Sequence, residues 1–289
     1  MATAVTNGGS LDTLLGRGAA ESASRARDEM LAMVAHDLRN PLNSISMASQ
    51  LLLSDPALDA EVTRKTVHMM QRAANRMNRL IGDLLDARQI ESGSFLVEMR
   101  PGLPSAVVRD ALDMLQPIAA SKGQRLDTAI EPGLPAVEVD CGRIQQVISN
   151  LVGNAIKFSP PGSVITTGAQ GRPGAVRISV TDTGPGIPPD ELPRIFDRYW
   201  QGKGRERGGL GLGLAIAKAI VEAHGGCIGV YSAPGAGTTF YFDIPLLAGV
   251  TPGQPRPSPS PSHRAGGDPA HSGRHRIPTP RGLAGKLVE

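Results

Sequence analysis

His36 and Asp37 are neighbours in a segment whose apolar residues recur at the spacing of a packed helix. Four apolar residues follow one another every seven positions: Leu31, Leu38, Ile45 and Leu52. His36 falls off this seam, so its imidazole should face solvent beside the Asp37 carboxylate. Most exposed helical histidines are simply solvated, but a neutral imidazole can also act as a nucleophile.

Pro41 lies inside the same predicted helix, one turn beyond His36. An internal proline removes a backbone hydrogen bond and costs about 3 kcal/mol. A helix that keeps this proline is expected to bend there and to use the bend beside the histidine.

A polar stripe is predicted on a helix over residues 142–158, for which Asp140 is a suitable N-cap. The apolar residues fall on one side, and Asn150, Asn154 and Lys157 fall on the other. Carboxamide oxygens can bind Mg²⁺ together with substrate phosphates, and the lysine adds a positive charge. Such a stripe can also be ordinary solvated surface.

Asp182 directly follows the apolar strand predicted over residues 176–181 and begins the sequence Asp-Thr-Gly-Pro-Gly-Ile. A carboxylate at a strand end can accept a hydrogen bond from the exocyclic amine of adenine. Gly184 and Gly186 permit close backbone approach and unusual backbone angles. A purely structural turn remains the alternative.

A glycine-rich segment, residues 208–214, leads directly into another predicted helix. Glycines at a helix N-terminus offer free N–H groups and a positive dipole end to phosphate. The segment matches neither a P-loop nor a dinucleotide-binding turn. The aromatic residues of 196–200 and the polar residues 201–207 precede it and could form a lid, or the aromatics could anchor a loop to the core.

Two long amphipathic helices must position the histidine, one over residues 21–54 and one over residues 58–90, where Gly93 is a plausible C-cap. The second helix has its own seam: Thr66, Met70, Ala73, Met77, Leu80, Leu84 and Ala87. A helical hairpin cannot bury both seams by itself. A dimeric four-helix bundle would bury them, and packing against the following domain is the alternative.

The remainder predicts an α/β domain over residues 93–248, with a turn at 235–237. Strands are expected at 95–98, 137–139, 164–167, 176–181, 227–232 and 238–244, and helices at about 104–121, 141–157 and 212–224. Residues 1–20 are predicted to be a flexible arm, 21–92 the hairpin, and 249–289 a disordered tail rich in Pro, Ser and Arg.

The composition is that of an ordinary globular protein, with 289 residues of which 40% are hydrophobic and 20% charged. A net charge of +3 is too small to indicate nucleic-acid binding. No apolar run approaches the roughly 18–20 residues of a membrane span, and no secretory signal is present. Two distant cysteines, Cys141 and Cys227, suggest a reducing compartment. We therefore expect a cytoplasmic protein.

Together, five segments resemble the transmitter core of a two-component sensor histidine kinase. They resemble, in order, the family's H box, N box, first glycine box, F box and second glycine box: residues 36–42, 150–159, 182–187, 196–200 and 208–217. The resemblance covers about residues 25–247. It implies a dimerisation and histidine-phosphotransfer hairpin followed by an ATP-binding α/β sandwich of the Bergerat type.

The resemblance implies roles for the hairpin residues. His36 would accept the phosphoryl group from ATP, and Asp37 would be the general base that orients and deprotonates it. Asn40 would position the water that dephosphorylates the partner's aspartate. Most of the remaining catalysis would come from the positioning of the histidine and ATP and from the charge of Mg²⁺.

The resemblance also implies an ATP and Mg²⁺ site in the α/β domain. Asn154 would hold Mg²⁺ with help from Asn150, and Lys157 would contact the phosphates. Asp182 would bind adenine. The following residues would complete the pocket and its lid: Phe158, Gly184, Gly186, Ile187, Gly209, Leu210, Gly211, Leu212 and Gly213.

The implied partners are a second copy of the chain in a homodimer and the receiver domain of a response regulator. Only about 20–25 residues precede the hairpin, too few for a sensor domain or a membrane anchor. The input would then come from a separate sensor protein, or the chain is a fragment of a longer one.

Two departures leave alternatives open. Leu210 stands where the family often has Thr or Ser, and Phe158 replaces a common Tyr. The second is a mild change, but Leu210 and the missing sensor domain leave a second hypothesis, a dimeric ATP-binding scaffold or a phosphatase-biased kinase with weak autokinase activity. A third, an ATPase of the gyrase or mismatch-repair type, has no use for the His36 hairpin.

Overall fold

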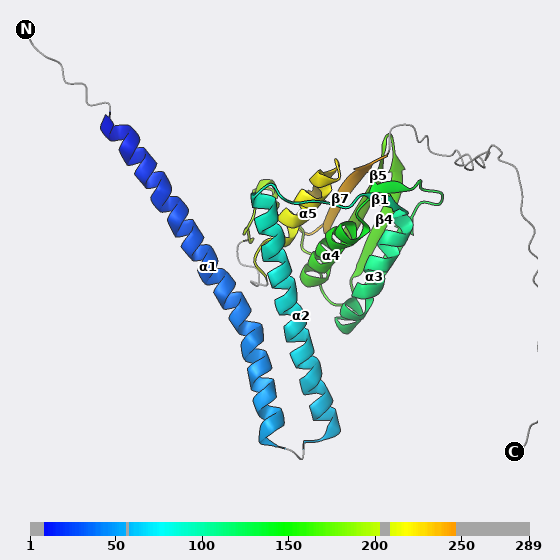
Figure 1. Ribbon diagram of the computed structural model, residues 1–289. Helices are drawn as coiled ribbons and strands as arrows, with labels where there is room; N and C mark the ends of the chain where they lie inside the picture. Colours follow the sequence, from blue (N-terminus) through cyan, green and yellow to red (C-terminus); the bar gives the residue numbers. More distant parts are fainter. Residues whose placement is uncertain (1–8, 56–57, 203–208, 247–289) are drawn as a thin grey trace, which may run out of the picture. The chain divides into compact units, whose positions relative to one another are not determined.

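The computed structural model describes residues 9–55, 58–202 and 209–246, with side chains from Ala32 onward. The tail predicted over residues 249–289 lies outside the described residues, as do residues 203–207 of the predicted lid and Gly208 of the glycine-rich segment. Two long helices come first, and an α/β domain follows them (Figure 1).

The two helices form the predicted hairpin: α1 spans Gly9–Ser54 and α2 spans Ala60–Glu91. Asp59 caps α2 by accepting a hydrogen bond from the backbone N–H of Glu61 at 3.3 Å. All seven predicted seam residues of α2 are buried or half-buried, so the apolar spacing identified the packed side correctly. Gly93 follows the helix with a positive φ of 67°.

Helix α1 begins at Gly9 rather than near residue 21, so the flexible arm predicted over residues 1–20 is wrong for residues 9–20. Leu, Arg and Ala in this stretch have high helix propensity and the stretch has no proline, so an existing helix can extend through it although Gly16 and Gly18 oppose this. The helix also continues through Pro41, which is buried, and it bends along its course (Figure 1).

The α/β domain is built on a five-stranded sheet with the strand order β2-β4-β5-β7-β6. The strands are β2 (Arg125–Ile130), β4 (Val164–Arg172), β5 (Ala175–Asp182), β6 (Cys227–Ser232) and β7 (Thr238–Pro245). Strand β2 pairs with β4 in parallel, and all the other pairs are antiparallel. Two short strands, β1 (Arg100–Gly102) and β3 (Val137–Val139), form a separate ladder.

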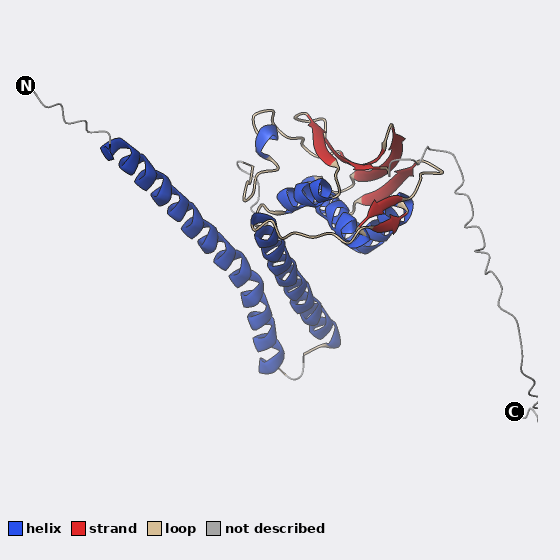
Figure 2. Cartoon of the chain, turned by 45° about the horizontal axis from the view of Figure 1, so that its top comes forward, coloured by secondary structure: helices blue, strands red, loops and turns tan. Residues whose placement is uncertain are grey.

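Three helices lie on one face of this sheet: α3 (Pro104–Ser121), α4 (Cys141–Phe158) and α5 (Gly213–Ala223) (Figure 2). A short 3-10 helix, η1, covers Leu192–Arg194. The core between helices and sheet is mainly aliphatic, in a chain of which only 3% of the residues are aromatic. Its largest fully buried side chains include Phe242, Ile144, Ile148, Leu151 and Ile165.

Three strand predictions differ from the structure, and one of them is the short strand β1, which was not predicted. Residues 95–98 form no strand, because their contacts go to side chains instead: Arg143 lies 4.8 Å above the Phe95 ring, and the Glu98 N–H donates to Asp140 at 3.1 Å. Strand β2 was not predicted. It is an edge strand whose residues are all half-buried or exposed, so its sequence lacks a clear apolar alternation.

The predicted turn at 235–237 does connect β6 and β7, and both glycines in it have positive φ. Gly237 also packs directly on the end of β5. A Cβ at this position would lie 2.1 Å from the backbone oxygen of Asp182. The turn therefore contacts the strand end that carries the predicted adenine-binding carboxylate.

Candidate nucleotide-binding and phosphotransfer site

His36 is the exposed member of a side-chain pair on α1. Its Nδ1 lies 3.2 Å from Asp37 Oδ1, and the side chains are 71% and 15% exposed respectively. If Nδ1 carries the proton that this hydrogen bond requires, Nε2 holds a lone pair that is open to solvent. The pair is the arrangement of a positioned nucleophile.

A small cavity lies beside this pair within the hairpin. It has a volume of about 240 Å³ and is lined by Asn40, Pro41, Ser44, Met69, Arg72, Ala73 and Arg76. Ser44 Oγ donates to the backbone oxygen of Asn40 at 3.1 Å. Asn40 and Pro41, which the sequence singled out, thus lie at the same cavity one turn beyond His36.

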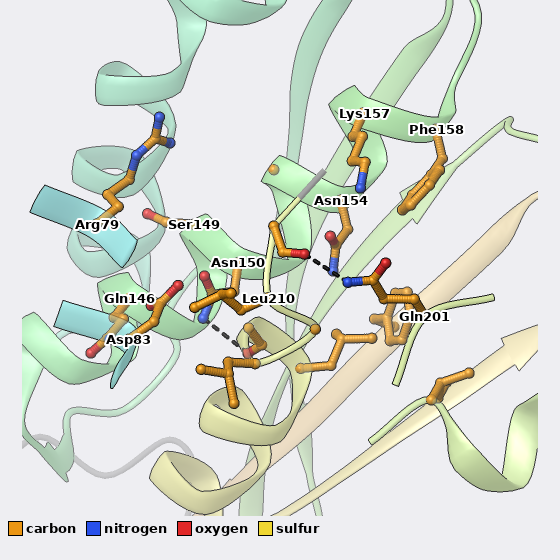
Figure 3. Close-up of a pocket in the computed structure, with 18 of the residues that line it drawn as sticks. Arg79, Asp83, Gln146, Ser149, Asn150, Asn154, Lys157, Phe158, Gln201 and Leu210 are labelled. Atoms are coloured by element: carbon orange, nitrogen blue, oxygen red, sulfur yellow. Dashed lines mark hydrogen bonds between the residues drawn. The ribbon is translucent and has the colours of Figure 1, made fainter. Parts of the chain in front are cut away.

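A much larger pocket, of about 1010 Å³, lies on the α/β domain and reaches the hairpin (Figure 3). Twelve predicted residues line it: Asn150, Asn154, Lys157, Phe158, Asp182, Gly186, Ile187, Gly209, Leu210, Gly211, Leu212 and Gly213. Gly184 is not part of the lining and acts on Asp182 instead. His36, Asp37 and Asn40 do not line the pocket, so the two halves of the predicted site are separate here.

Helix α4 presents the predicted polar stripe because its apolar side is fully used by the core. Its N-cap is Asp140, which accepts from the Arg143 N–H at 3.1 Å. Asn150 Nδ2 donates to the backbone oxygen of Gly213 at 3.0 Å, which leaves its carboxamide oxygen as an acceptor. Lys157 Nζ lies 4.7 Å above the Phe158 ring.

Asp182 stands at the end of β5 with one carboxylate oxygen already engaged. The Gly184 N–H donates to its Oδ1 at 2.8 Å, and a Cβ at Gly184 would meet that same atom at 2.8 Å. Burial raises the pKa of Asp182, while hydrogen bonds from the backbone of Gly184 and Thr238 lower it. These two backbone hydrogen bonds hold the carboxylate in place at the wall of the pocket.

The glycine-rich segment is attached to the residues that precede it. Gly211 has φ 69°, and its backbone oxygen accepts from the Tyr199 N–H at 3.0 Å. Gln201 Nε2 donates to the Gly209 oxygen at 2.8 Å (Figure 3). Leu210 is buried, at 3% exposure. The described end of the predicted lid therefore has fixed contacts.

The aromatic residues of 196–200 do not all do the same thing: Phe196 anchors the loop to the sheet, and Trp200 lines the pocket. Phe196 packs edge-on against Phe240 in β7, with ring centroids 6.3 Å apart and planes at 84°. Trp200 does line the pocket, and its backbone oxygen would lie 2.6 Å from a Cβ at Gly211. Of the two interpretations left open by the sequence, the structure favours anchoring for Phe196.

The sequence did not identify the hairpin's contribution to the pocket. Arg76, Arg79, Leu80 and Asp83 of α2 line it, and Arg76 also lines the smaller cavity beside Asn40. Burial and the nearby Asp86 charge raise the pKa of Asp83 to about 6, and the Arg79 charge acts in the opposite direction. No local motif signals such residues, because their place depends on packing between domains.

An ion pair joins the hairpin to α4. The Asp86 carboxylate accepts from Arg143 Nη1 at 2.8 Å and from Gln146 Nε2 at 2.7 Å. A second pair joins Glu91, at the end of α2, to Arg198 at 2.9 Å. These contacts hold one wall of the pocket in place.

The described part of the chain contains no group of three or more His, Cys, Asp or Glu side chains that could hold a metal ion. A divalent ion in the pocket would thus depend on carboxamide oxygens and on substrate oxygens, as suits Mg²⁺. None of the described helices is both apolar enough and long enough to span a bilayer.

Two family models match the chain, one for each structural part. Residues 26–93 match the His Kinase A (phospho-acceptor) domain. Residues 139–248 match the histidine kinase-, DNA gyrase B- and HSP90-like ATPase domain. The hairpin and most of the α/β domain thus each belong to a known domain type.

Similar proteins include sensor kinases from several bacteria. Sensor histidine kinase AruS of Pseudomonas aeruginosa is 36% identical over 81% of this chain and 24% of its own length. Adaptive-response sensory kinase SasA of Synechocystis sp. is 35% identical over 76% of this chain and 59% of its own length. The chain spans between 19% and 60% of the length of such curated relatives.

Solved structures with both parts are also similar. The crystal structure of full-length ShkA in complex with AMPPNP has a TM-score of 0.59 and 31% identity, covering 78% of this chain and 47% of that one. Histidine kinase ThkA in complex with the response regulator protein TrrA has a TM-score of 0.54 and 25% identity, covering 84% and 68%. With a phospho-acceptor hairpin that exposes His36 and an ATPase domain behind it, this chain belongs to the two-component sensor histidine kinases as a transmitter core.

Proposed function

We propose that this chain phosphorylates His36 from ATP and transfers the phosphoryl group to an aspartate of a response regulator. The observation that carries the proposal is the exposed imidazole beside Asp37, with Nδ1 and Oδ1 3.2 Å apart. It stands on a chain that also carries a large pocket with the predicted nucleotide-binding residues. Neither feature alone would indicate this reaction.

In the first step, the Nε2 lone pair of His36 attacks the γ-phosphorus of ATP. The bond from that phosphorus to the bridging oxygen breaks, and ADP leaves with the electron pair. Asp37 holds the Nδ1 proton and stabilises the positive charge that develops on the ring. In the second step, a receiver-domain carboxylate attacks the same phosphorus and the N–P bond breaks.

For ATP binding, we propose that Asp182 accepts from the adenine amine. Asn154, with Asn150, would hold Mg²⁺ through carboxamide oxygens, and Lys157 would contact the phosphates. The bound Mg²⁺ would neutralise part of the triphosphate charge. The backbone of residues 209–213 would pass over the phosphates at the N-terminus of α5.

We propose that the working form is a homodimer. The hairpin exposes a set of large apolar side chains: Leu42, Met47, Leu51 and Leu53 on α1, and Val62, Val67, Met69, Ile81 and Leu85 on α2. Packing against the α/β domain leaves this set uncovered. A second hairpin would bury it in a four-helix bundle.

The reverse reaction and the setting complete the proposal. Asn40, one turn beyond His36, would position a water to dephosphorylate the regulator. The complex of ThkA with TrrA supports a response-regulator partner for this family. ATP as donor supports a cytoplasmic location. The relatives do not favour the scaffold with weak autokinase activity.

Labelling with γ-labelled ATP and Mg²⁺ tests the proposal. The chain should acquire acid-labile, base-stable label, and His36→Gln should abolish it. His68→Gln, which removes an exposed histidine of α2, is the matched control and should label normally. Label that survived in His36→Gln would overturn the assignment of the phosphorylated residue.

A further inference from the structure

Two polar stripes face the nucleotide pocket from different domains. The α2 stripe contains residues three or four positions apart, which places them on one side of that helix. It consists of Arg76, Arg79, Asp83 and Asp86. The α4 stripe follows the same rule and consists of Arg143, Gln146, Asn150, Asn154 and Lys157. All of these except Asp86 and Arg143 line the pocket.

The two stripes are joined at one end. The buried Asp86 carboxylate accepts from Arg143 and Gln146, both in the first half of α4. The other members of the two stripes follow this contact along their helices and line the pocket. Figure 3 shows Asp83 level with Gln146, and Arg79 farther along.

The two arginines of the α2 stripe, Arg76 and Arg79, differ from its two carboxylates. Asp86 is paired, and Asp83 is partly buried. No described residue makes a hydrogen bond or an ion pair with the Arg79 guanidinium, which acts on Asp83 only through its charge. A guanidinium that lines a pocket without such a partner matches an anionic ligand, and its planar fork suits phosphate oxygens.

We propose that Arg79 binds the terminal phosphates of the nucleotide while the Asp86–Arg143 pair is formed. The hairpin would thus contribute a phosphate-binding residue to a pocket that otherwise belongs to the ATPase domain. The inference rests on the proposed function, because it takes ATP as the ligand. A simpler role, in which Arg79 only offsets the Asp83 charge, predicts no preference for nucleotides with more phosphates.

The experiment measures the affinities of adenosine, ADP and ATP for the full chain by calorimetry, in a His36→Gln background that prevents turnover. Arg79→Gln should raise the Kd for ATP about fivefold, the Kd for ADP less, and the Kd for adenosine not at all. Arg79→Lys should restore part of the loss. Arg88→Gln, an exposed arginine of the same helix outside the pocket, is the control and should change none of them.

The dependence on the ion pair is tested in a double variant. Asp86→Asn should itself weaken ATP binding. Adding Arg79→Gln to that variant should then raise the Kd for ATP by less than about twofold. An equal loss for adenosine and ATP in Arg79→Gln, or no loss beyond that of Arg88→Gln, would overturn the inference alone. If the starting protein bound no ATP, the proposed function would fail as well.

Discussion

Asp86 on α2 and Arg143 on α4 stand 57 positions apart in the sequence, yet their side chains meet at 2.8 Å. The pair fixes the hairpin against the helix that carries the asparagines of the pocket. With the pair formed, His36 is not among the residues that line this pocket. If ATP binds in this pocket as proposed, it would have to move relative to the hairpin before His36 could react.

We expect Asp86→Asn to label His36 severalfold faster than the unaltered chain at saturating ATP. Removing the charge weakens a partly buried ion pair and frees the ATPase domain to reach the histidine. The measurement is the initial rate of labelling. Asp127→Asn, which breaks the exposed pair with Arg125, is the control. Slower labelling in Asp86→Asn would mean that the paired arrangement is itself the productive one.

The pH dependence of stability should change with Asp83→Asn. The folded pKa of Asp83 is about 6, above its ordinary value of 3.8. When folding raises the pKa of a carboxyl group, the protonated group stabilises the folded state at pH values below its pKa in the unfolded chain. This stability is lost as the pH rises through its pKa in the folded chain. The free energy of unfolding of Asp83→Asn, relative to that of the unaltered chain, should therefore rise by about 1 kcal/mol between about pH 5 and about pH 8. Denaturant unfolding at both pH values measures it, and an advantage independent of pH would contradict the assignment.

Gly211→Ala should weaken ATP binding by at least about tenfold and destabilise the fold by about 2 kcal/mol. The added Cβ would lie 2.6 Å from the backbone oxygen of Trp200, at a residue whose φ is 69°. Thermal unfolding and calorimetry measure the two effects. Gly171→Ala is the control, because its Cβ would have no neighbour nearer than 3.7 Å. Normal ATP binding in Gly211→Ala would show that the loop can relax.

Met47→Glu should lower the dimer affinity by about tenfold or more. Met47 is 70% exposed on the hairpin, and a glutamate there would have to be buried in the second copy without a partner. Analytical ultracentrifugation across a range of concentrations measures the change. Asn75→Glu adds the same charge at an exposed position of α2 and should leave the dimer intact. Equal dissociation of both variants would point to net charge rather than to this surface.

Local signals explain which parts the sequence predicted. The stripe of Asn150, Asn154 and Lys157 follows from helical spacing, and the Asp140 cap follows from its place before an apolar run. Asp182 was found because a buried strand ends at it. Each of these signals lies within a few residues of the atoms it positions, so the neighbouring sequence is sufficient.

The parts that were missed depend on contacts that are distant in sequence. Strand β2 forms because β4 supplies a partner, although its own residues alternate poorly. The hairpin's wall of the pocket depends on the pairing of Asp86 with Arg143, and nothing near Arg79 indicates it. Residues 95–98 have the composition of a strand but contact Arg143 and Asp140 instead.

The close packing of Gly237 on Asp182 also limits how this protein can change over time. A side chain at position 237 would displace the backbone of Asp182, the residue proposed to bind adenine. Surface turns normally tolerate substitution, whereas this one should accept almost none in a selection for activity. Any active variant with a substitution at position 237 should carry a compensating substitution at the end of β5. We therefore expect the two segments to change together in evolution.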